Sequence, residues 1–300
     1  MSGVVTRRGA DSGVYADLFA GQFCSEHDCA RHLVGVRWPN GFCCPHCLSV
    51  RFVPPDTRGR YLCVNPYCRS QTTVTSGTLF EKTHARLRTW FRVGWGLTVA
   101  SRWCGTAAMT ACMLREGYDV TERTVRRMTG RYLLLMATAE RWRLDKDVTV
   151  GVTSLNLQDR RVEILLAVER GVGGRSGGRI RIDLVRGEDP VGGFLGRCVR
   201  AGSVVQLTST ASRLGSVGSQ WRSASASATV PARLGRLGTE LRGWFCGPAR
   251  EFDEACRAFE FRKNQTLGVL EIFEGAPTGR VFAQLIRLAA VTSVDELESS

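Results

Sequence analysis

The sequence predicts a multidomain protein that mixes helices and strands, of the α+β or α/β class. Three observations support this prediction. Cysteines occur in two close pairs near the N-terminus, a region of helical periodicity follows from about residue 86 to 144, and from Val148 the pattern changes to the alternation of β-strands. We expect three domains, at residues 1–80, 81–145 and 146–300, which a chain of 300 residues can accommodate.

The chain is strongly basic. It carries 41 Lys plus Arg against 28 Asp plus Glu, a formal net charge of +13 with a pI of about 9.6. This balance favours a polyanionic partner, nucleic acid before membrane, because no run approaches the roughly 18 apolar residues of a membrane span. The first residues lack the apolar segment of a secretory signal. We therefore expect an intracellular protein in a reducing compartment, in the bacterial cytoplasm or nucleoid or in a eukaryotic nucleus.

The N-terminal domain contains a pattern typical of a zinc ribbon. Cys44 and Cys47 form a Cys-x2-Cys pair, Cys63 and Cys68 form a Cys-x4-Cys pair, and the chain between them is long enough for one short hairpin. Four thiolates at such spacings match a closed tetrahedral structural site, which favours Zn2+. The alternatives are unrelated buried cysteines or half of a disulfide framework, and the paired spacing argues against both.

Other possible ligands lie near the two pairs. Cys43 adjoins a ligand and points the other way along the strand, so we exclude it. His46 could replace a thiol, but all four thiols are already present. Cys24, His27 and Cys29 have a poor spacing for a second site and no fourth ligand, so we interpret them as core residues.

The chain before and after the ribbon is predicted to be helical. Residues 1 to about 14 are a polar tail that we expect to be disordered. Two short helices are expected between Tyr15 and Leu33. The segment Leu87 to Ala100 is too apolar for a freely solvated helix, so we expect it to be buried between domains.

A helix pair follows that resembles a helix-turn-helix. Thr106 to Glu116 is expected to form the first helix, Gly117 to end it, and Thr121 to cap the second. Arginines facing out at the start of such a helix suit phosphates and guanine edges, although a solvated helix in an Arg-rich protein is the alternative. Beside a zinc ribbon and a charge of +13 we favour DNA contact. The predicted contact residues are Arg123, Thr124, Arg126, Arg127 and Arg131.

The last domain is predicted to contain an α/β layer. Three consecutive strands, a possible short helix at residues 190–200 and another strand are expected from β-branched content and alternation. Ser209 to Thr229, rich in Ser, Ala and Gly, is expected to be a mobile loop. Helices are expected at residues 249–263 and 279–290. The expected strands are Val148 to Leu155, Arg161 to Glu169, Arg179 to Val185 and Ser203 to Leu207.

The order of these parts resembles the zinc-ribbon DDE transposases of bacterial insertion sequences, which are related to eukaryotic Merlin elements. The resemblance covers roughly residues 15 to 270 and is more specific in its first half. The segments that carry it there are Arg37 to Gly41, Cys44 to Cys47, Tyr61 to Cys63, Cys68, Thr75 to Phe80 and Leu87 to Phe91. In the second half they are Gly178 to Ile182, Gly202 to Val205 and Phe259 to Asn264.

The resemblance implies an RNase H-like core in which carboxylates hold two Mg2+ ions for DNA strand transfer. The family's first acidic pair falls on Gly151 and Val152, the second acid near Thr208 and the third near Gly235. None of these positions carries a carboxylate. We therefore expect a degenerate RNase H-like core that binds no Mg2+, since two divalent ions would have no hard-oxygen ligands.

The distribution of ionisable residues strengthens this expectation without any alignment. No Asp, Glu or His occurs between Asp189 and Glu240, and the last histidine is His84. A Ser-His-Asp or Cys-His site within the last domain is thereby excluded. Asp145, Asp147, Asp183 and Glu240 are possible replacement acids, but we favour solvated strand ends and surface ion pairs.

These inferences combine into one hypothesis. We expect a transposase-derived, zinc-binding protein that binds double-stranded DNA and has lost strand-transfer activity. Such a protein would be a domesticated pseudoenzyme. We further expect a homo-oligomer or protein partners, and no membrane contact. The alternatives are an active DDE transposase with relocated acids, a scaffold or interaction module that meets RNA or an acidic protein, and a decaying gene product.

Overall fold

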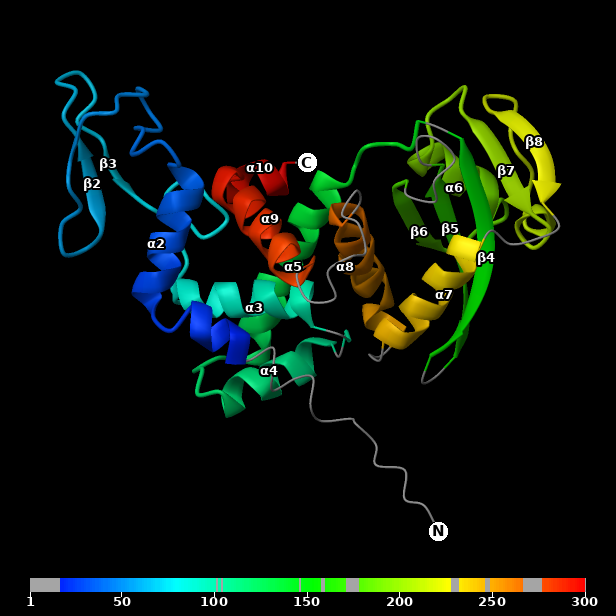
Figure 1. Cartoon of the computed structure of the whole chain (residues 1–300), viewed down its shortest axis with the longest axis horizontal. Coiled ribbons are helices and arrows are strands. Elements are labelled where there is room, and N and C mark those ends of the chain that lie inside the picture. Colours follow the sequence, from blue (N-terminus) through cyan, green and yellow to red (C-terminus); the bar gives the residue numbers. More distant parts are fainter. Residues whose placement is uncertain are drawn as a thin grey trace, which may run out of the picture. The chain divides into compact units, whose positions relative to one another are not determined.

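The computed structural model divides into two units, which are taken one at a time below (Figure 1). The first contains the described residues up to 100, those of 114–135 and those from 282 onward, and the second contains those of 102–113 and 136–281. No described helix is long and apolar enough to cross a membrane. The expected N-terminal tail lies outside the described residues. These are 17–100, 102–103, 105–145, 147–157, 160–170, 178–227, 232–245, 249–266 and 277–299.

The first unit begins with helices that lead into a small antiparallel sheet. Residues 17–22 are helical, and Ser25 starts the next helix by a capping box with Asp28, in which its hydroxyl accepts the Asp28 N–H at 3.2 Å. The two helices expected between Tyr15 and Leu33 are therefore present, and the second extends to Arg37. The elements are α2 (Glu26–Arg37), β1 (Phe52–Val53), β2 (Arg60–Cys63) and β3 (Gln71–Thr73), with strand order β1-β2-β3.

Helix α3 (Leu87–Val99) forms the core of the first unit. Almost every side chain along it is buried, as its composition predicts. Its neighbours belong to the same unit rather than to a second domain: the Phe91 ring lies 5.2 Å from that of Phe23 and 5.7 Å from that of Phe282. Aromatic rings at such separations add to the stabilisation from burial. The C-terminal helices α9 (Pro277–Val291) and α10 (Val294–Glu298) end the chain.

Helices α4 (Gly105–Arg115) and α5 (Glu122–Ala139) form the helix pair that the sequence predicts. Tyr132 of α5 is fully buried, and its hydroxyl donates to the Trp90 carbonyl at 3.1 Å. A Cβ on Gly94 would lie 3.1 Å from the Tyr132 ring. The glycine therefore allows the Tyr132 ring to pack closely against α3.

The second unit is built on a mixed five-stranded sheet. Its strand order is β6-β5-β4-β7-β8, in which β4, β5 and β6 are antiparallel and β7 and β8 run parallel to β4. Three strands, a helix and a fourth strand follow in the predicted order. The elements are β4 (Val148–Asn156), β5 (Arg161–Glu169), β6 (Ile180–Leu184), α6 (Pro190–Cys198), β7 (Val204–Thr208), η2 (Ala211–Arg213), β8 (Arg222–Ser227), α7 (Ala232–Trp244), η3 (Ala249–Glu251) and α8 (Phe252–Gln265).

Helices cover both faces of this sheet. Val150 belongs to an apolar cluster with Phe194 of α6, while the next residue, Gly151, meets Leu234 of α7. Successive strand residues point to opposite faces, so α6 and α7 lie on opposite sides of β4. A Cβ on Gly238 would lie 3.2 Å from Thr153 Oγ1, so this glycine allows α7 to approach the strand.

Side chains of α8 protect the outer edge of β6. Glu260 Oε2 accepts the Ile182 N–H at 3.0 Å. Asn264 accepts the Ile180 N–H at 2.8 Å and donates to the Ile180 carbonyl at 3.2 Å. Unpaired groups on an edge strand are a template for aggregation, and these bonds satisfy them as a neighbouring strand would. The resemblance segments at Gly178–Ile182 and Phe259–Asn264 thus meet each other.

Two predictions for this unit are wrong. The segment Ser209–Thr229, expected to be a mobile loop, contains η2 and the edge strand β8. Its Ser- and Ala-rich sequence does not predict a strand, and the hydrogen bonds that form β8 come from its pairing with β7. Helix α7 was not predicted, since Gly235, Gly238 and Gly243 give it a weak propensity. Its packing against β4 and β5 stabilises the helix despite this weak propensity.

Candidate metal centre

Two similar turns of backbone present the four predicted cysteines. In the first turn, the Leu48 N–H donates to the Cys44 carbonyl at 2.9 Å, and in the second the Arg69 N–H donates to the Asn65 carbonyl at 3.0 Å. Leu48 and Arg69, each immediately after the second cysteine of its pair, have φ values of 59° and 49°. This left-handed conformation is costly for residues other than glycine, so both turns are held against local strain.

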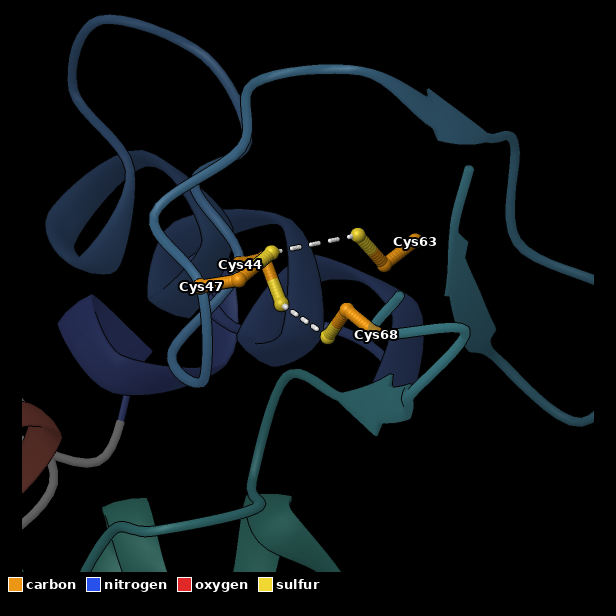
Figure 2. Close-up of side chains that lie close together, drawn as sticks. All are labelled: Cys44, Cys47, Cys63 and Cys68. Atoms are coloured by element: carbon orange, nitrogen blue, oxygen red, sulfur yellow. Dashed lines mark hydrogen bonds between the residues drawn. The ribbon is translucent and has the colours of Figure 1, made fainter. Parts of the chain in front are cut away.

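The four sulfur atoms converge on one point. Figure 2 shows the Cys44 Sγ facing that of Cys68 at 3.8 Å and the Cys47 Sγ facing that of Cys63 at 3.6 Å. All four ligand atoms lie within 4.8 Å of one another, and all four residues are free thiols. Sulfurs about 2.3 Å from a tetrahedral Zn2+ would be about 3.8 Å apart. The cluster therefore fits a structural Zn2+ ion, as the spacing predicts.

Hydrogen bonds around the sulfurs favour thiolate formation. Burial opposes ionisation of Cys44, but hydrogen bonds from Ser70 and from the backbone N–H groups of His46 and Cys47 lower its pKa to about 6. The backbone at Ser49 also stabilises the Cys47 thiolate, but burial and the three neighbouring thiols raise the pKa of Cys47 to about 11. The sulfurs cannot all ionise together without a cation, and a divalent ion provides the missing charge.

Ser70 supports the cluster and was not predicted. Its hydroxyl lies 3.2 Å from both the Cys44 Sγ and the Cys68 Sγ. Residues that hydrogen-bond to metal ligands orient them and tune the site. A hydroxyl two residues after the last cysteine is the only signal for this role that the sequence contains.

Aromatic residues shield one side of the cluster. The rings of Phe42 and Tyr61 stack 5.3 Å apart, and Trp38 lies 4.8 Å from Phe42. Arg37 at the end of α2 donates to the carbonyls of Thr73 at 2.9 Å and Val74 at 2.8 Å. These bonds attach the ribbon sheet to the preceding helix.

The other nearby cysteines and histidines lie outside the cluster. The Cys43 Sγ donates to the Leu48 carbonyl at 3.5 Å, and His46 is not among the converging groups. Cys29 is a core residue as expected, and burial raises its pKa to about 12, but the same interpretation is wrong for Cys24 and His27, which are exposed. Among the described residues, no second group of three metal-ligating side chains comes together.

Comparison with known families identifies the segment that holds the cluster. Residues 24–71 match the family model of the transposase zinc-ribbon domain, and all four cysteines fall within the match. The four cysteines therefore lie in a segment that is similar to a transposase zinc ribbon. No curated protein and no solved structure matches the chain. The match covers only a short N-terminal part of the chain. It supports a relationship to transposases for that part and includes no residue of the sheet unit.

The turn between α4 and α5 is defined by local signals. Gly117 follows α4 with a φ of 84°, and Thr121 Oγ1 accepts the Thr124 N–H at 3.2 Å, so both predicted end signals are confirmed. Arg92 of α3 makes a two-pronged ion pair with Glu116, at 2.6 and 2.7 Å. This pair fastens the turn to the core of the first unit.

The predicted DNA-contact residues lie along one exposed side of α5. Val125 and Met128 are fully buried, and the intervening Arg126 and Arg127 are exposed. Glu122 engages Arg126 at 2.5 Å. The exposed members of the set are Arg123, Arg126 and Arg127, and Thr124 and Arg131 are half-buried.

The acids considered as replacement catalytic residues are each ion-paired. Their oxygens lie 2.5–3.6 Å from a guanidinium or ammonium nitrogen. This agrees with the interpretation of these residues as strand ends and surface pairs. The pairs are Asp145–Arg179, Asp147–Arg170, Asp183–Arg197 and Glu240–Lys263.

Two of the positions to which the resemblance assigns family acids, Gly151 and Thr208, meet on the sheet. A Cβ on Gly151 would lie 3.1 Å from Leu234 Cδ1 and 3.5 Å from Thr208 Oγ1. The residue of α7 that faces Gly151 is Leu234, whereas Gly235 is exposed with open space around it. Leu234 therefore fills the space into which an acid on β4 would project.

Proposed function

We propose that this protein is a transposase-derived DNA-binding protein whose degenerate RNase H-like core no longer transfers DNA strands. The zinc ribbon and the helix pair α4 and α5 bind duplex DNA. The sheet unit serves as a scaffold for a second copy or a partner protein. In this proposal Zn2+ stabilises the DNA-binding half, and no Mg2+ acts in the other half.

The observation that carries the proposal is the meeting of Gly151, Thr208 and Leu234. Gly151 and Thr208, far apart in the sequence, meet where the resemblance calls for carboxylates, and Leu234 faces Gly151 in place of Gly235, the third such position. Such a site supplies no hard, negatively charged oxygens for a pair of divalent ions. Elsewhere in the described residues, acids do not gather in threes.

DNA binding is supported by charge and by the start of α5. The transposase zinc ribbon associates the first unit with nucleic acid, and the chain carries a net charge of +13. Arg123 and Arg127 are exposed within the first two turns of α5, where they can reach phosphates or base edges. Arg126 must leave its ion pair with Glu122 to contact a phosphate, and the high negative charge of DNA favours that exchange.

A gel-shift titration of duplex DNA at several salt concentrations tests the helix assignment. We expect the triple variant Arg123→Ala/Arg126→Ala/Arg127→Ala to bind at least about 10-fold more weakly, with a salt slope reduced by about 1 for each lost phosphate contact. Glu122→Gln should strengthen binding because it removes the competing carboxylate. The control Arg200→Ala/Arg213→Ala/Arg250→Ala removes the same charge from exposed positions of the second unit. Equal binding by the two triple variants would refute the assignment.

A cleavage and joining assay on DNA ends with Mg2+ or Mn2+ tests the loss of chemistry. We expect no metal-dependent product from the zinc-loaded protein. Product formation that a single substitution at Asp145, Asp147, Asp183 or Glu240 abolishes would instead establish an active enzyme with relocated acids. Light scattering of the same preparation measures whether the chain self-associates.

A further inference from the structure

A cavity of about 410 Å³ lies in the second unit, where the hairpin of β4 and β5 approaches the end of α7. Its apolar lining residues are Leu155, Leu157 and Phe245, of which Leu155 and Phe245 are buried. Its polar lining residues include two arginines. The volume falls within the range of small-ligand sites. The lining residues are Ser154, Leu155, Asn156, Leu157, Arg161, Arg242 and Phe245.

Both arginines in the cavity are held by neutral oxygens. Arg242 donates to Thr153 Oγ1 at 3.2 Å, to the Ser154 carbonyl at 3.4 Å and to Thr239 Oγ1 at 3.1 Å. Arg161 donates to Ser154 Oγ at 2.9 Å. No carboxylate of the described residues forms an ion pair with either guanidinium. Among the described residues, two positive charges thus face one cavity without a carboxylate partner.

The cavity lies about two helical turns along α7 from Leu234, the residue that faces Gly151. Along α7, Leu234 contacts Gly151, Gly238 contacts Thr153, and Arg242 then bonds Thr153 and Ser154. A carboxylate at Gly151 would repel a phosphate unless a divalent cation lay between them. Here that position is uncharged and the neighbouring charges are cationic, so a phosphate can bind without a metal ion.

We propose that Arg161 and Arg242, with Ser154 and Asn156, form a metal-independent binding pocket for a phosphate of a nucleic-acid strand. Each guanidinium presents parallel N–H donors that match phosphate oxygens. Ser154 and Asn156 supply neutral hydrogen bonds at the rim, and Leu155 and Phe245 offer an apolar surface to the adjoining sugar or base. The inference rests on the proposed DNA-binding function and assigns a second contact to it, apart from α5.

Fluorescence anisotropy of the full-length zinc-loaded protein with a labelled short single-stranded DNA, in a buffer with no added Mg2+ and no chelator, tests the pocket. The double variant Arg161→Ala/Arg242→Ala should bind about 10-fold more weakly, since hydrogen bonds between charged groups are lost. Asn156→Asp should weaken binding to a similar degree, because Asn156 pairs with Arg161 across the hairpin and a carboxylate there would occupy that guanidinium. The control Arg200→Ala/Arg213→Ala removes two exposed charges elsewhere in the unit.

Asn156→Asp keeps the bonds from Arg242 to β4, so weaker binding by this variant does not arise from unfolding. A thermal melt of each variant checks that it is folded. Weaker binding by both pocket variants than by the control, unchanged by added Mg2+, supports the proposal. Pocket variants that bind like the control, or wild-type binding that requires Mg2+, overturn it. Failure of the α5 variants in the duplex titration would leave this result standing, so the two assignments fail separately.

Discussion

The zinc ribbon and the sheet unit differ in how closely each fits the resemblance to transposases. In the ribbon, four sulfurs converge at distances that suit one tetrahedral ion. In the sheet unit, α8 covers the edge of β6, but the positions where the resemblance expects acids carry none, and Leu234 rather than Gly235 faces Gly151. Under the proposed function, this difference is what the stability contribution of each group predicts. A structural metal holds a small domain together, whereas clustered catalytic carboxylates repel one another and can be lost without unfolding a sheet.

Loss of a zinc ligand should have the largest effect. Cys63→Ser removes one thiolate from a site whose metal contributes about 10–16 kcal/mol in small zinc domains, so the ribbon should unfold locally and lose its zinc. Elemental analysis and limited proteolysis of residues 38–75 measure both outcomes. Cys43→Ser is the matched control, because Cys43 adjoins the cluster without belonging to it. A Cys63→Ser protein that keeps a full equivalent of zinc would contradict the four-sulfur site.

The buried ion cluster of the sheet unit should produce the next largest effect. Glu260 and Glu140 share Arg181, which also donates to the carbonyls of Glu140 and Trp142. Glu260→Ala leaves Arg181 partly unpaired and exposes the edge of β6, so we expect a loss of about 3–5 kcal/mol in the free energy of unfolding, measured by urea denaturation. Glu188→Ala, at an exposed position, is the control. A loss below about 1 kcal/mol would show that the edge does not depend on this cluster.

The same cluster predicts a pH dependence. Burial raises the pKa of Glu260 from an ordinary 4.5 to about 7, against the opposing effect of Arg181. The folded state therefore holds this proton more tightly than the unfolded state does. The resulting stability is complete below about pH 4.5 and is lost as the pH rises through about 7. Urea titrations between these pH values should give a falling free energy of unfolding, and Glu260→Gln should flatten the curve.

Restoring one family acid should sharpen the contrast between the two regions. Gly151→Asp drives a side chain against Leu234 Cδ1, so we expect a loss of about 1–3 kcal/mol and no gain of metal-dependent cleavage. Gly235→Asp, at an exposed position of α7 with open space, should be nearly neutral. Thermal unfolding with and without Mg2+ measures both variants. Stabilisation of Gly151→Asp by Mg2+ would mean that the site still accepts a metal ion.

Relief of backbone strain in the ribbon should have the smallest effect. Leu48 has a φ of 59° and an exposed side chain, so Leu48→Gly should stabilise the zinc-loaded ribbon by about 1 kcal/mol. Val50→Gly, also exposed, tests the general cost of a new glycine and should not stabilise. Thermal unfolding of the zinc-loaded protein separates the two. Equal destabilisation by both changes would show that the turn at Leu48 carries no strain.

Local pattern was sufficient to predict the regular elements that carry strong signals. β5 (Arg161–Glu169) has the predicted bounds, and Gly117 and Thr121 delimit the helix pair as expected. The helix α7 and the strand β8 were missed because glycine, serine and alanine give weak propensities, and contacts with β4 and β7 override them. Ser70 was missed because its role depends on two sulfurs reaching the same hydroxyl.

The sequence by itself determined the metal chemistry. Ligand identity and spacing restrict Cys44, Cys47, Cys63 and Cys68 to one closed site, whatever surrounds them. Only the tertiary structure decided that Leu234 rather than Gly235 faces Gly151, and that two arginines share a cavity near that point. Such proximities arise between residues far apart in the sequence, 88 and 89 positions for the bonds from Arg242 to β4, and no local periodicity encodes them.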